Sequence, residues 1–196
     1  NFLEEKTTGK ADGILVNSKF TSRIFCETFK SLNIVPDVLY PSLVTSIFDK
    51  LQSDEQVQGI HENSILLLSI NRYERKKNLE LALKAVKYLE AELSQDEWNR
   101  IQLAVIGGYD KQNTENIEYF EELQAVSEKL KLSDKVVFLK SPTDEMKVKL
   151  LKRCQVLFYT PSNEHFGIVP LEAMYCRKPV IAVNSGGPTE TIGEAN

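Results

Sequence analysis

Residues 65–72 read Ile65-Leu66-Leu67-Leu68-Ser69-Ile70-Asn71-Arg72, an apolar run that ends abruptly in polar and basic residues. The run is continuous rather than alternating, which is typical of a strand buried on both faces. Similar runs follow at residues 102–106, 136–139, 156–159 and 179–183, and stretches of helical periodicity separate them. This pattern predicts the α/β class: a doubly wound, Rossmann-like parallel sheet with helices on both faces.

The intervening helices are predicted from apolar residues spaced three or four apart. One stripe is formed by Leu79, Ala82, Leu83, Val86 and Leu89, and a second by Ile117, Phe120, Leu123 and Leu130. A third helix should begin at Thr143, because Asp144 and Glu145 follow where the helix dipole favours acids. Met146, Leu150 and Cys154 would then face inward.

The first 45 residues differ from the rest in organisation. They predict a strand at 14–16, a helix capped by Asn17 or Ser18, and an extended stretch at 38–40. One such βα unit cannot cover both faces of its sheet. Residues 1–45 are therefore expected to close a mostly absent amino-terminal domain. Residues 46–63 should form a linker, and residues 64–196 a second domain that is incomplete at its carboxyl end. With Asn1 at its start, the chain is interpreted as a piece of a larger protein.

Composition and charge limit the possible function. The 196 residues carry a net charge of −4, so we expect no broad basic surface for nucleic acid. The apolar run at 65–68 is far shorter than the roughly 18 residues of a membrane-spanning helix, and the piece is expected to be soluble. Cys26, Cys154 and Cys176 form no Cys-x-x-Cys pair and are interpreted as reduced thiols in the core of a cytosolic protein.

A basic loop follows the first strand of the larger domain. It reads Asn71-Arg72-Tyr73-Glu74-Arg75-Lys76-Lys77-Asn78 and contains four cations. Such a loop is either solvated or binds phosphate. Its position at the carboxyl end of a strand, where parallel sheets bind ligands, favours a diphosphate held by Arg72 and one of Lys76 and Lys77.

A second motif leads from a strand through glycine into a helix. It reads Pro161-Ser162-Asn163-Glu164-His165-Phe166-Gly167-Ile168-Val169-Pro170-Leu171-Glu172-Ala173-Met174. Gly167 permits close approach of the backbone to a ligand, and the next helix offers unpaired amides. Glu164 and Glu172 could accept hydrogen bonds from sugar and ribose hydroxyls. The alternative is a capped helix with incidental acids. His165 has no serine, cysteine or metal-ligand partner in sequence, so its interpretation as a base is weak.

A third motif, Asn184-Ser185-Gly186-Gly187-Pro188-Thr189-Glu190, places paired glycines after the fifth strand and a proline at the start of a helix. The glycines either approach a ligand or simply form a tight loop. The fingerprints of dinucleotide-binding and P-loop proteins are absent from the sequence, which disfavours those two classes.

Together the three motifs resemble those of the retaining glycosyltransferases with two facing Rossmann-like domains, the GT-B, family 4-like group. In that family two glutamates are separated by seven residues, as Glu164 and Glu172 are here. The amino-acid sequences of these motifs are most similar to those of the mannosyltransferases that extend the dolichol-linked precursor of asparagine-linked glycans. The resemblance covers essentially the whole chain.

This resemblance implies a retaining mannosyltransferase that uses GDP-mannose, with α-1,3 and then α-1,6 transfer to a dolichol-diphosphate-linked oligosaccharide. It also implies work at the cytosolic face of the endoplasmic reticulum, membrane association through parts outside the chain, and no cofactor or metal. The absence of Asp-x-Asp agrees with the last expectation. We expect residues 64–196 to bind the nucleotide sugar, residues 1–45 to belong to the acceptor domain, and the isolated chain to be inactive.

The family roles can be carried over to individual residues. Arg72 and Lys77 would stabilise the leaving diphosphate, and Glu164 would hold the transferred mannose. Glu172 would bind the ribose, and Phe166, Gly167, Ile168, Gly186 and Gly187 would complete the donor site. Two departures leave questions open: Asn71 replaces a frequent glycine, and Lys76 lies beside Lys77. Another donor such as UDP-glucose, or a non-catalytic nucleotide-sugar-binding module, remains an alternative.

Overall fold

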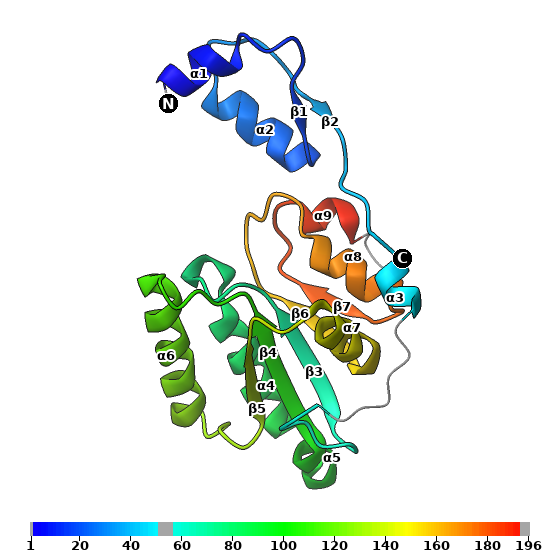
Figure 1. Cartoon of the computed structure of the whole chain (residues 1–196). Helices are drawn as coiled ribbons and strands as arrows, with labels where there is room; N and C mark the ends of the chain where they lie inside the picture. Colours follow the sequence, from blue (N-terminus) through cyan, green and yellow to red (C-terminus); the bar gives the residue numbers. More distant parts are fainter. Residues whose placement is uncertain (1, 51–56, 193–196) are drawn as a thin grey trace.

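The larger part of the molecule is built on five parallel strands. The computed structural model describes residues 2–50 and 57–192. The strands are β3 (Ile65–Ile70), β4 (Ile101–Gly107), β5 (Val136–Lys140), β6 (Val156–Tyr159) and β7 (Val180–Ala182). They lie side by side in the order β5-β4-β3-β6-β7, and every neighbouring pair is parallel (Figure 1). The predicted doubly wound α/β sheet is therefore confirmed.

Helices cover both faces of this sheet, because side chains at alternate strand positions point to opposite sides. On one face α4 (Leu79–Glu92), α5 (Gln95–Arg100) and α6 (Thr114–Lys129) pack on a core that includes Leu67 and Leu103. On the other face α3 (Ser46–Lys50), α7 (Asp144–Arg153) and α8 (Ile168–Tyr175) pack on Leu66 and Leu68. The two faces thus have separate hydrophobic cores.

Sequence explains where these helices begin. Thr143 caps α7 as predicted, and its hydroxyl accepts a hydrogen bond from the amide of Met146 at 3.2 Å. Ser94 and Glu97 form a capping box at the start of α5, a short helix that the apolar pattern does not predict. Within α7, Leu150 is buried and Met146 half-buried, and Cys154, which ends the helix, is buried, in agreement with the inward face expected for them.

The strand order creates a switch point between β3 and β6. From β3 the chain proceeds outward through β4 to β5, and it then returns to the other side of β3 to form β6 and β7. Connections therefore leave the carboxyl ends of β3 and β6 toward opposite faces. In open α/β sheets such a point leaves a crevice in which ligands bind.

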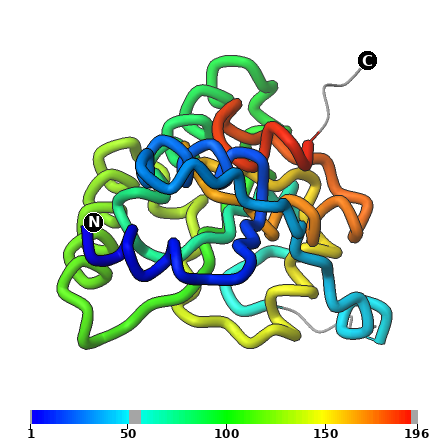
Figure 2. Tube along the Cα trace, turned by 90° about the horizontal axis from the view of Figure 1, so that it is seen from above, coloured from blue at the N-terminus to red at the C-terminus, as the bar shows by residue number. Residues whose placement is uncertain are grey.

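The amino-terminal segment is smaller and lies over the carboxyl edge of the large sheet (Figures 1 and 2). It consists of α1 (Phe2–Thr8), β1 (Leu15–Val16), α2 (Lys19–Thr28) and β2 (Asp37–Val38). The two short strands pair in parallel, Leu15 with Asp37 and Val16 with Val38. Ser18 caps α2, which selects one of the two caps that the sequence leaves open.

A set of polar contacts joins this segment to the larger part. The carboxylate of Glu190, in α9 (Pro188–Thr191), accepts hydrogen bonds from the main-chain amides of Lys19 and Phe20 at 2.9 and 2.6 Å. It also accepts one from the Tyr40 hydroxyl at 2.9 Å. Thr21 Oγ1 lies 2.9 Å from Nδ1 of His165. The first turn of α2 is thus fixed against loops of the larger part.

The segment expected to be a linker, residues 46–63, contributes to the core where it is described. It contains α3, and Phe48, Val57 and Ile60 are buried against the sheet. Residues 51–56 lie outside the described residues, as do residues 193–196 at the end of the predicted second domain.

No described helix combines the length and apolarity needed to cross a membrane. The three cysteines are free thiols. Only Cys154 is buried, so the prediction of core thiols holds for Cys154, while Cys26 and Cys176 are half-buried. Burial raises the pKa of Cys154 to about 11, which keeps this thiol protonated at neutral pH.

Candidate active site

A cavity of about 810 Å³ lies at the switch point, where β3 and β6 end. Its wall contains residues from both motifs that follow these strands and from the amino-terminal segment. Seven of them carry the argument below: Arg72, Lys77, Lys147, Glu164, Phe166, Gly167 and Ile168. A cavity of this size is typical of small-molecule sites.

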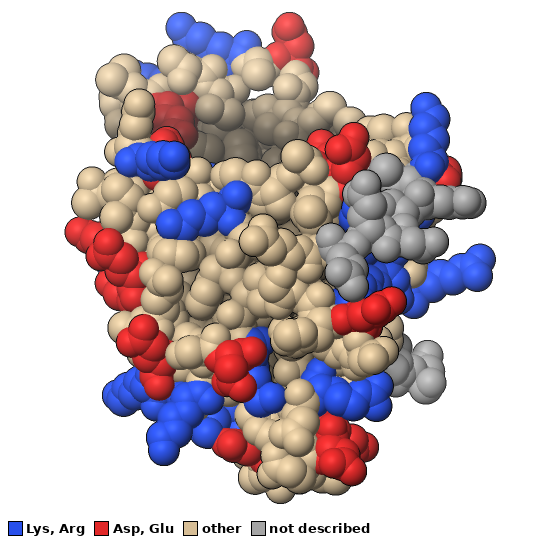
Figure 3. Space-filling view, turned by 60° about the horizontal axis from the view of Figure 1, so that its bottom comes forward, with Lys and Arg blue, Asp and Glu red and all other residues tan. Residues whose placement is uncertain are grey.

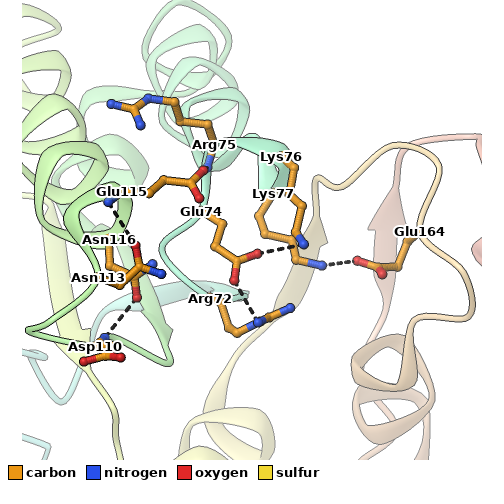
Figure 4. A network of polar contacts seen from close by, with 10 residues as sticks. All are labelled: Arg72, Glu74, Arg75, Lys76, Lys77, Asp110, Asn113, Glu115, Asn116 and Glu164. Atoms are coloured by element: carbon orange, nitrogen blue, oxygen red, sulfur yellow. Dashed lines mark hydrogen bonds and ion pairs between the residues drawn. The ribbon is translucent and has the colours of Figure 1, made fainter. Parts of the chain in front are cut away.

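The basic loop after β3 contains a cluster of paired charges (Figure 4). Glu74 is buried, and its two carboxylate oxygens contact Arg72 at 2.8 Å and Lys76 at 3.1 Å. The side chain of Arg72 is still 61% exposed and lines the cavity. Glu74 therefore orients a guanidinium group that remains free to bind an anionic ligand.

The structure separates the roles of the two adjacent lysines. Lys77 is buried, lines the cavity and forms an ion pair with Glu164 across the gap between the β3 and β6 loops (Figure 4). Its main-chain oxygen accepts a hydrogen bond from Thr160 Oγ1 at 2.7 Å. Lys76 is 67% exposed, contacts Glu74 and does not line this cavity. Lys77 is thus the lysine placed to reach a ligand.

Gly186 and Gly187 lie behind the loop that carries Glu164, and neither lines the cavity of 810 Å³. The amide of Gly187 donates to the carbonyl of Glu164 at 2.7 Å. Gly186 has φ +69°, and a Cβ there would lie 2.5 Å from the Glu164 carbonyl oxygen. These glycines permit two backbones to pack closely, so they support the loop rather than line the cavity.

Gly167 forms the turn into α8. Its φ of +81° is unfavourable for other residues, and a Cβ would lie 3.1 Å from the hydroxyl oxygen of Tyr159 and 3.2 to 3.3 Å from its ring. Phe166, Gly167 and Ile168 all line the cavity. Because no side chain caps the start of α8, the amides of its first turn have no partner from a capping residue.

Glu172 lies deeper, within α8, and does not line this cavity. It forms part of an adjoining cavity of about 260 Å³ that shares Ser42, Lys147 and Ile168 with the larger one. Its Oε1 accepts a hydrogen bond from Lys147 Nζ at 2.8 Å. The sequence motif thus brings Glu164 and Glu172 to the same region, but to different walls.

His165 faces the amino-terminal segment. Its ring contacts Thr21 and stacks edge-on against Phe20 with ring centroids 5.9 Å apart. Its carbonyl accepts a hydrogen bond from Ser18 Oγ. Through these contacts His165 helps to join the amino-terminal segment to the larger part of the molecule, and it also lines the cavity.

Sequence reasoning missed Lys147 and Tyr159. Lys147 belongs to α7, whose polar residues look like an ordinary solvated face, and Tyr159 ends the predicted strand β6. One signal for Lys147 is its spacing from Thr143: the cap of a helix after a strand faces the carboxyl edge, and a residue four positions later lies on the same side. Burial raises the pKa of Tyr159 above its usual range, so its hydroxyl stays neutral.

Basic and acidic side chains are interspersed on the face of the molecule shown in Figure 3. With a net charge of −4, this mixture offers no reason to expect a broad attraction for nucleic acid. The positive charge of the cavity comes instead from a few local groups, Arg72, Lys77 and Lys147.

Comparison with solved structures shows the same architecture. Sucrose-phosphate synthase from Thermosynechococcus elongatus matches with a TM-score of 0.77 and 21% identity, over 98% of this chain and 45% of the other. Anabaena Alr3699/HepE in complex with UDP and glucose matches with a TM-score of 0.73 and 20% identity, over 94% of this chain and 47% of the other. At such low identities these likenesses establish the fold alone.

Sequence comparison gives nearer relatives. The alpha-1,3/1,6-mannosyltransferase ALG2 of Homo sapiens is 54% identical over 98% of this chain, and that of Saccharomyces cerevisiae is 40% identical over 98% of it. The chain spans about half the length of these curated relatives, 47% and 42%. The model of the family described as glycosyl transferases group 1 matches residues 52–196. With this match over most of its length, the chain belongs to the group 1 glycosyltransferase family.

Proposed function

We propose that the protein transfers mannose from GDP-mannose to a dolichol-diphosphate-linked oligosaccharide, first in α-1,3 and then in α-1,6 linkage. The observation that carries this proposal is the 40 to 54% identity, over nearly the whole chain, to relatives named alpha-1,3/1,6-mannosyltransferase. The cavity at the switch point supports it, because the cations Arg72, Lys77 and Lys147 and the carboxylate of Glu164 meet there. We further propose that the reaction takes place at the cytosolic face of the endoplasmic reticulum and that the protein associates with the membrane through parts outside this chain.

The geometry suggests how the residues divide the work. Arg72 and Lys77 line one side of the cavity, where their charges would neutralise the diphosphate as it leaves the sugar. Lys77 is paired with Glu164, so binding of the diphosphate would exchange one anionic partner for another. Glu164 would then be free to accept hydrogen bonds from the mannose.

The amides at the start of α8, next to Phe166, Gly167 and Ile168, would add donors for phosphate or sugar oxygens. Glu172 would accept hydrogen bonds from the ribose. The Gly186-Gly187 loop would keep Glu164 in place through its main chain. Transfer with retention would depend on alignment of donor and acceptor in a cleft from which water is excluded.

The decisive experiment measures transfer of radiolabelled mannose from GDP-mannose to a lipid-linked acceptor by the full-length protein, with Arg72→Ala as a comparison of reduced activity. Lack of transfer by a folded wild-type protein would reject the proposal. We also expect the 196-residue chain alone to bind GDP weakly and to transfer nothing, because the acceptor wall should lie mainly in the amino-terminal domain.

We further propose that the reaction needs no metal ion, since Arg72 and Lys77 supply positive charge at the site of the leaving group. The described residues hold no group of three or more histidine, cysteine, aspartate or glutamate side chains arranged for a metal ion. Assays with and without EDTA test this part. A rate that depends on added Mg²⁺ or Mn²⁺ would contradict it.

A second candidate keeps the reaction and changes the donor. The solved Alr3699/HepE complex contains UDP and glucose, so the same fold accommodates a uridine nucleotide in that protein. Competition of GDP and UDP for the site separates the two candidates: tighter binding of UDP would favour a UDP-sugar donor. A non-catalytic binding module would bind the nucleotide and transfer no sugar in the full-length protein.

A further inference from the structure

Glu172 is a buried carboxylate, and one of its two oxygens has no hydrogen-bond partner among the described residues. The residue is only 7% exposed, yet it lies in the middle of α8 and lines a cavity. Its Oε1 accepts a hydrogen bond from Lys147 Nζ at 2.8 Å, whereas Oε2 has no hydrogen-bond partner among the described residues. Buried polar atoms are nearly always paired, so an unpaired carboxylate oxygen beside a cavity indicates a place for a donor from a ligand.

Lys147 stands between Glu172 and the larger cavity. It belongs to α7, its side chain is 25% exposed, and it lines both the cavity of 810 Å³ and the adjoining one of 260 Å³. Its other carboxylate neighbour, Asp144, is 4.0 Å away and 78% exposed, so that contact is weak. The 2.8 Å bond to Glu172 is therefore the interaction that fixes the ammonium group.

The pairing has two consequences for Glu172. The ammonium group compensates a carboxylate that would otherwise be costly to bury. The bond also occupies one oxygen and holds the plane of the group, so Oε2 keeps a fixed direction. A fixed, charged acceptor is what recognition of a sugar hydroxyl requires, because hydrogen bonds to charged groups are the stronger ones.

We propose that Lys147 is a positioning residue for the donor: it holds Glu172 so that Oε2 accepts a hydrogen bond from a ribose hydroxyl of the nucleotide. This inference rests on the proposed function, which places a nucleotide sugar in the cavity. Lys147 acts through Glu172 and need not touch the reacting atoms. Its removal should reduce recognition of the ribose, whereas recognition of the diphosphate by Arg72 and Lys77 should persist.

The test compares GDP with its 2′-deoxy and 3′-deoxy analogues by calorimetry on the full-length protein. Wild type should prefer GDP over at least one analogue by about tenfold or more, the worth of a hydrogen bond to a charged group. Lys147→Met should bind GDP as weakly as it binds that analogue, which removes the preference. Lys147→Arg, which preserves the charge and a donor, should restore most of it.

Controls separate positioning from damage to the fold. Lys84→Met removes a lysine from another lysine–glutamate pair, with Glu80 on α4 and outside the cavity, and should preserve the preference. Lys147→Gln serves as a second variant if Lys147→Met unfolds. Under saturating GDP-mannose the rate of either Lys147 variant should approach that of wild type, so that KM changes more than kcat.

Each other result overturns the inference. If Lys147→Met weakens the binding of GDP and of both analogues by the same factor, the lysine acts on another part of the donor or on the fold. An undiminished preference for GDP in that variant shows that Glu172 needs no help from Lys147. Absence of any preference in wild type rejects the ribose role of Glu172, while the mannose-transfer assay still decides the proposed function independently.

Discussion

The two glutamates of the motif at residues 161–174 have opposite surroundings. Glu164 lies on the loop before Gly167, its side chain is 22% exposed, and its partner Lys77 comes from the loop after β3. Glu172 lies inside α8, its side chain is 10% exposed, and its partner Lys147 comes from α7. Both are paired with a lysine, but only Glu164 lines the larger cavity.

Spacing in the sequence alone therefore does not assign the roles of two similar residues. Glu164 sits where groups from both neighbouring loops meet, so its charge can act on a bond that breaks between them. Glu172 belongs to α8 and is held by Lys147 of α7. In the proposed reaction its charge would therefore fix a part of the ligand that does not react. Substitution at the two positions should therefore affect different kinetic constants.

The largest effect of a single substitution is expected for Glu164→Gln. The change keeps the size of the side chain but removes the ion pair with Lys77 and the charge that, in the proposed reaction, faces the transferred sugar. We expect the maximal rate to fall on the order of 100-fold, with a smaller effect on donor affinity. Steady-state kinetics over a range of GDP-mannose measures both. A normal maximal rate with weakened binding of GDP-mannose would show that Glu164 does not act on the reacting atoms.

Arg72→Ala should be nearly as severe. The guanidinium lines the cavity and is held by Glu74, so its loss should remove the proposed charge-assisted hydrogen bond to the diphosphate, worth about 1.5–3 kcal/mol. Transfer should fall by about 10 to 150-fold in a protein that melts like wild type.

Arg75→Ala is the matched control, because Arg75 contacts Glu118 and Glu122 on α6 and does not line the cavity (Figure 4 shows it pointing away from Arg72). Its transfer rate should stay close to that of wild type. Equal losses in both arginine variants would indicate a general effect of charge and not a contact of Arg72 with the donor.

Glu172→Gln should change affinity more than rate. The neutral amide accepts weaker hydrogen bonds and leaves Lys147 without its anionic partner. We expect the Kd of GDP to rise about tenfold, while transfer at saturating donor declines less than in the Glu164 variant. Calorimetry and transfer assays on the same preparation check this. A lower maximal rate with unchanged affinity would reverse the two roles.

The smallest effect is expected for Lys76→Ala. Lys76 is 67% exposed and contacts only Glu74 in the described ion pairs, and such surface pairs contribute little. Transfer should change less than about threefold, whereas Lys77→Ala should reduce it as Arg72→Ala does. Comparison of the two lysine variants resolves the question that the sequence leaves open. A strong loss with Lys76→Ala and none with Lys77→Ala would contradict the geometry.

Much of the fold follows from the sequence, because its signals are local. The apolar runs at 65–70 and 156–159 coincide with β3 and β6, and the loops after them form the cavity, as the rule for parallel sheets predicts. In α6 the pattern was less accurate. The predicted stripe contains Ile117 and Phe120, yet Asn116 and Tyr119 are among the residues most buried.

The reason in α6 is a polar contact that hydrophobic periodicity does not detect. Asn116 is buried because its side-chain oxygen accepts a hydrogen bond from the amide of Asp110 at 2.9 Å. The site was missed in part for the same reason. The bond between Lys147 and Glu172 and the pairing of Glu74 with Arg72 both depend on side-chain direction, which a sequence pattern does not contain.

The hydrogen bonds of Glu190 make the contact between the amino-terminal segment and the larger part sensitive to pH. Burial disfavours its charged form, but the hydrogen bonds from the amides of Lys19 and Phe20 and from the Tyr40 hydroxyl together outweigh this effect, so the pKa of Glu190 lies below its usual value. The contribution of these hydrogen bonds to the contact is present above the ordinary carboxyl pKa and disappears as the pH falls through the lowered one. Glu190 follows Gly186 and Gly187, which support Glu164. The short segment 186–190 therefore contacts both α2, through Glu190, and the loop that carries Glu164, through Gly186 and Gly187, so the joint with the amino-terminal segment and the support of that loop share one stretch of chain.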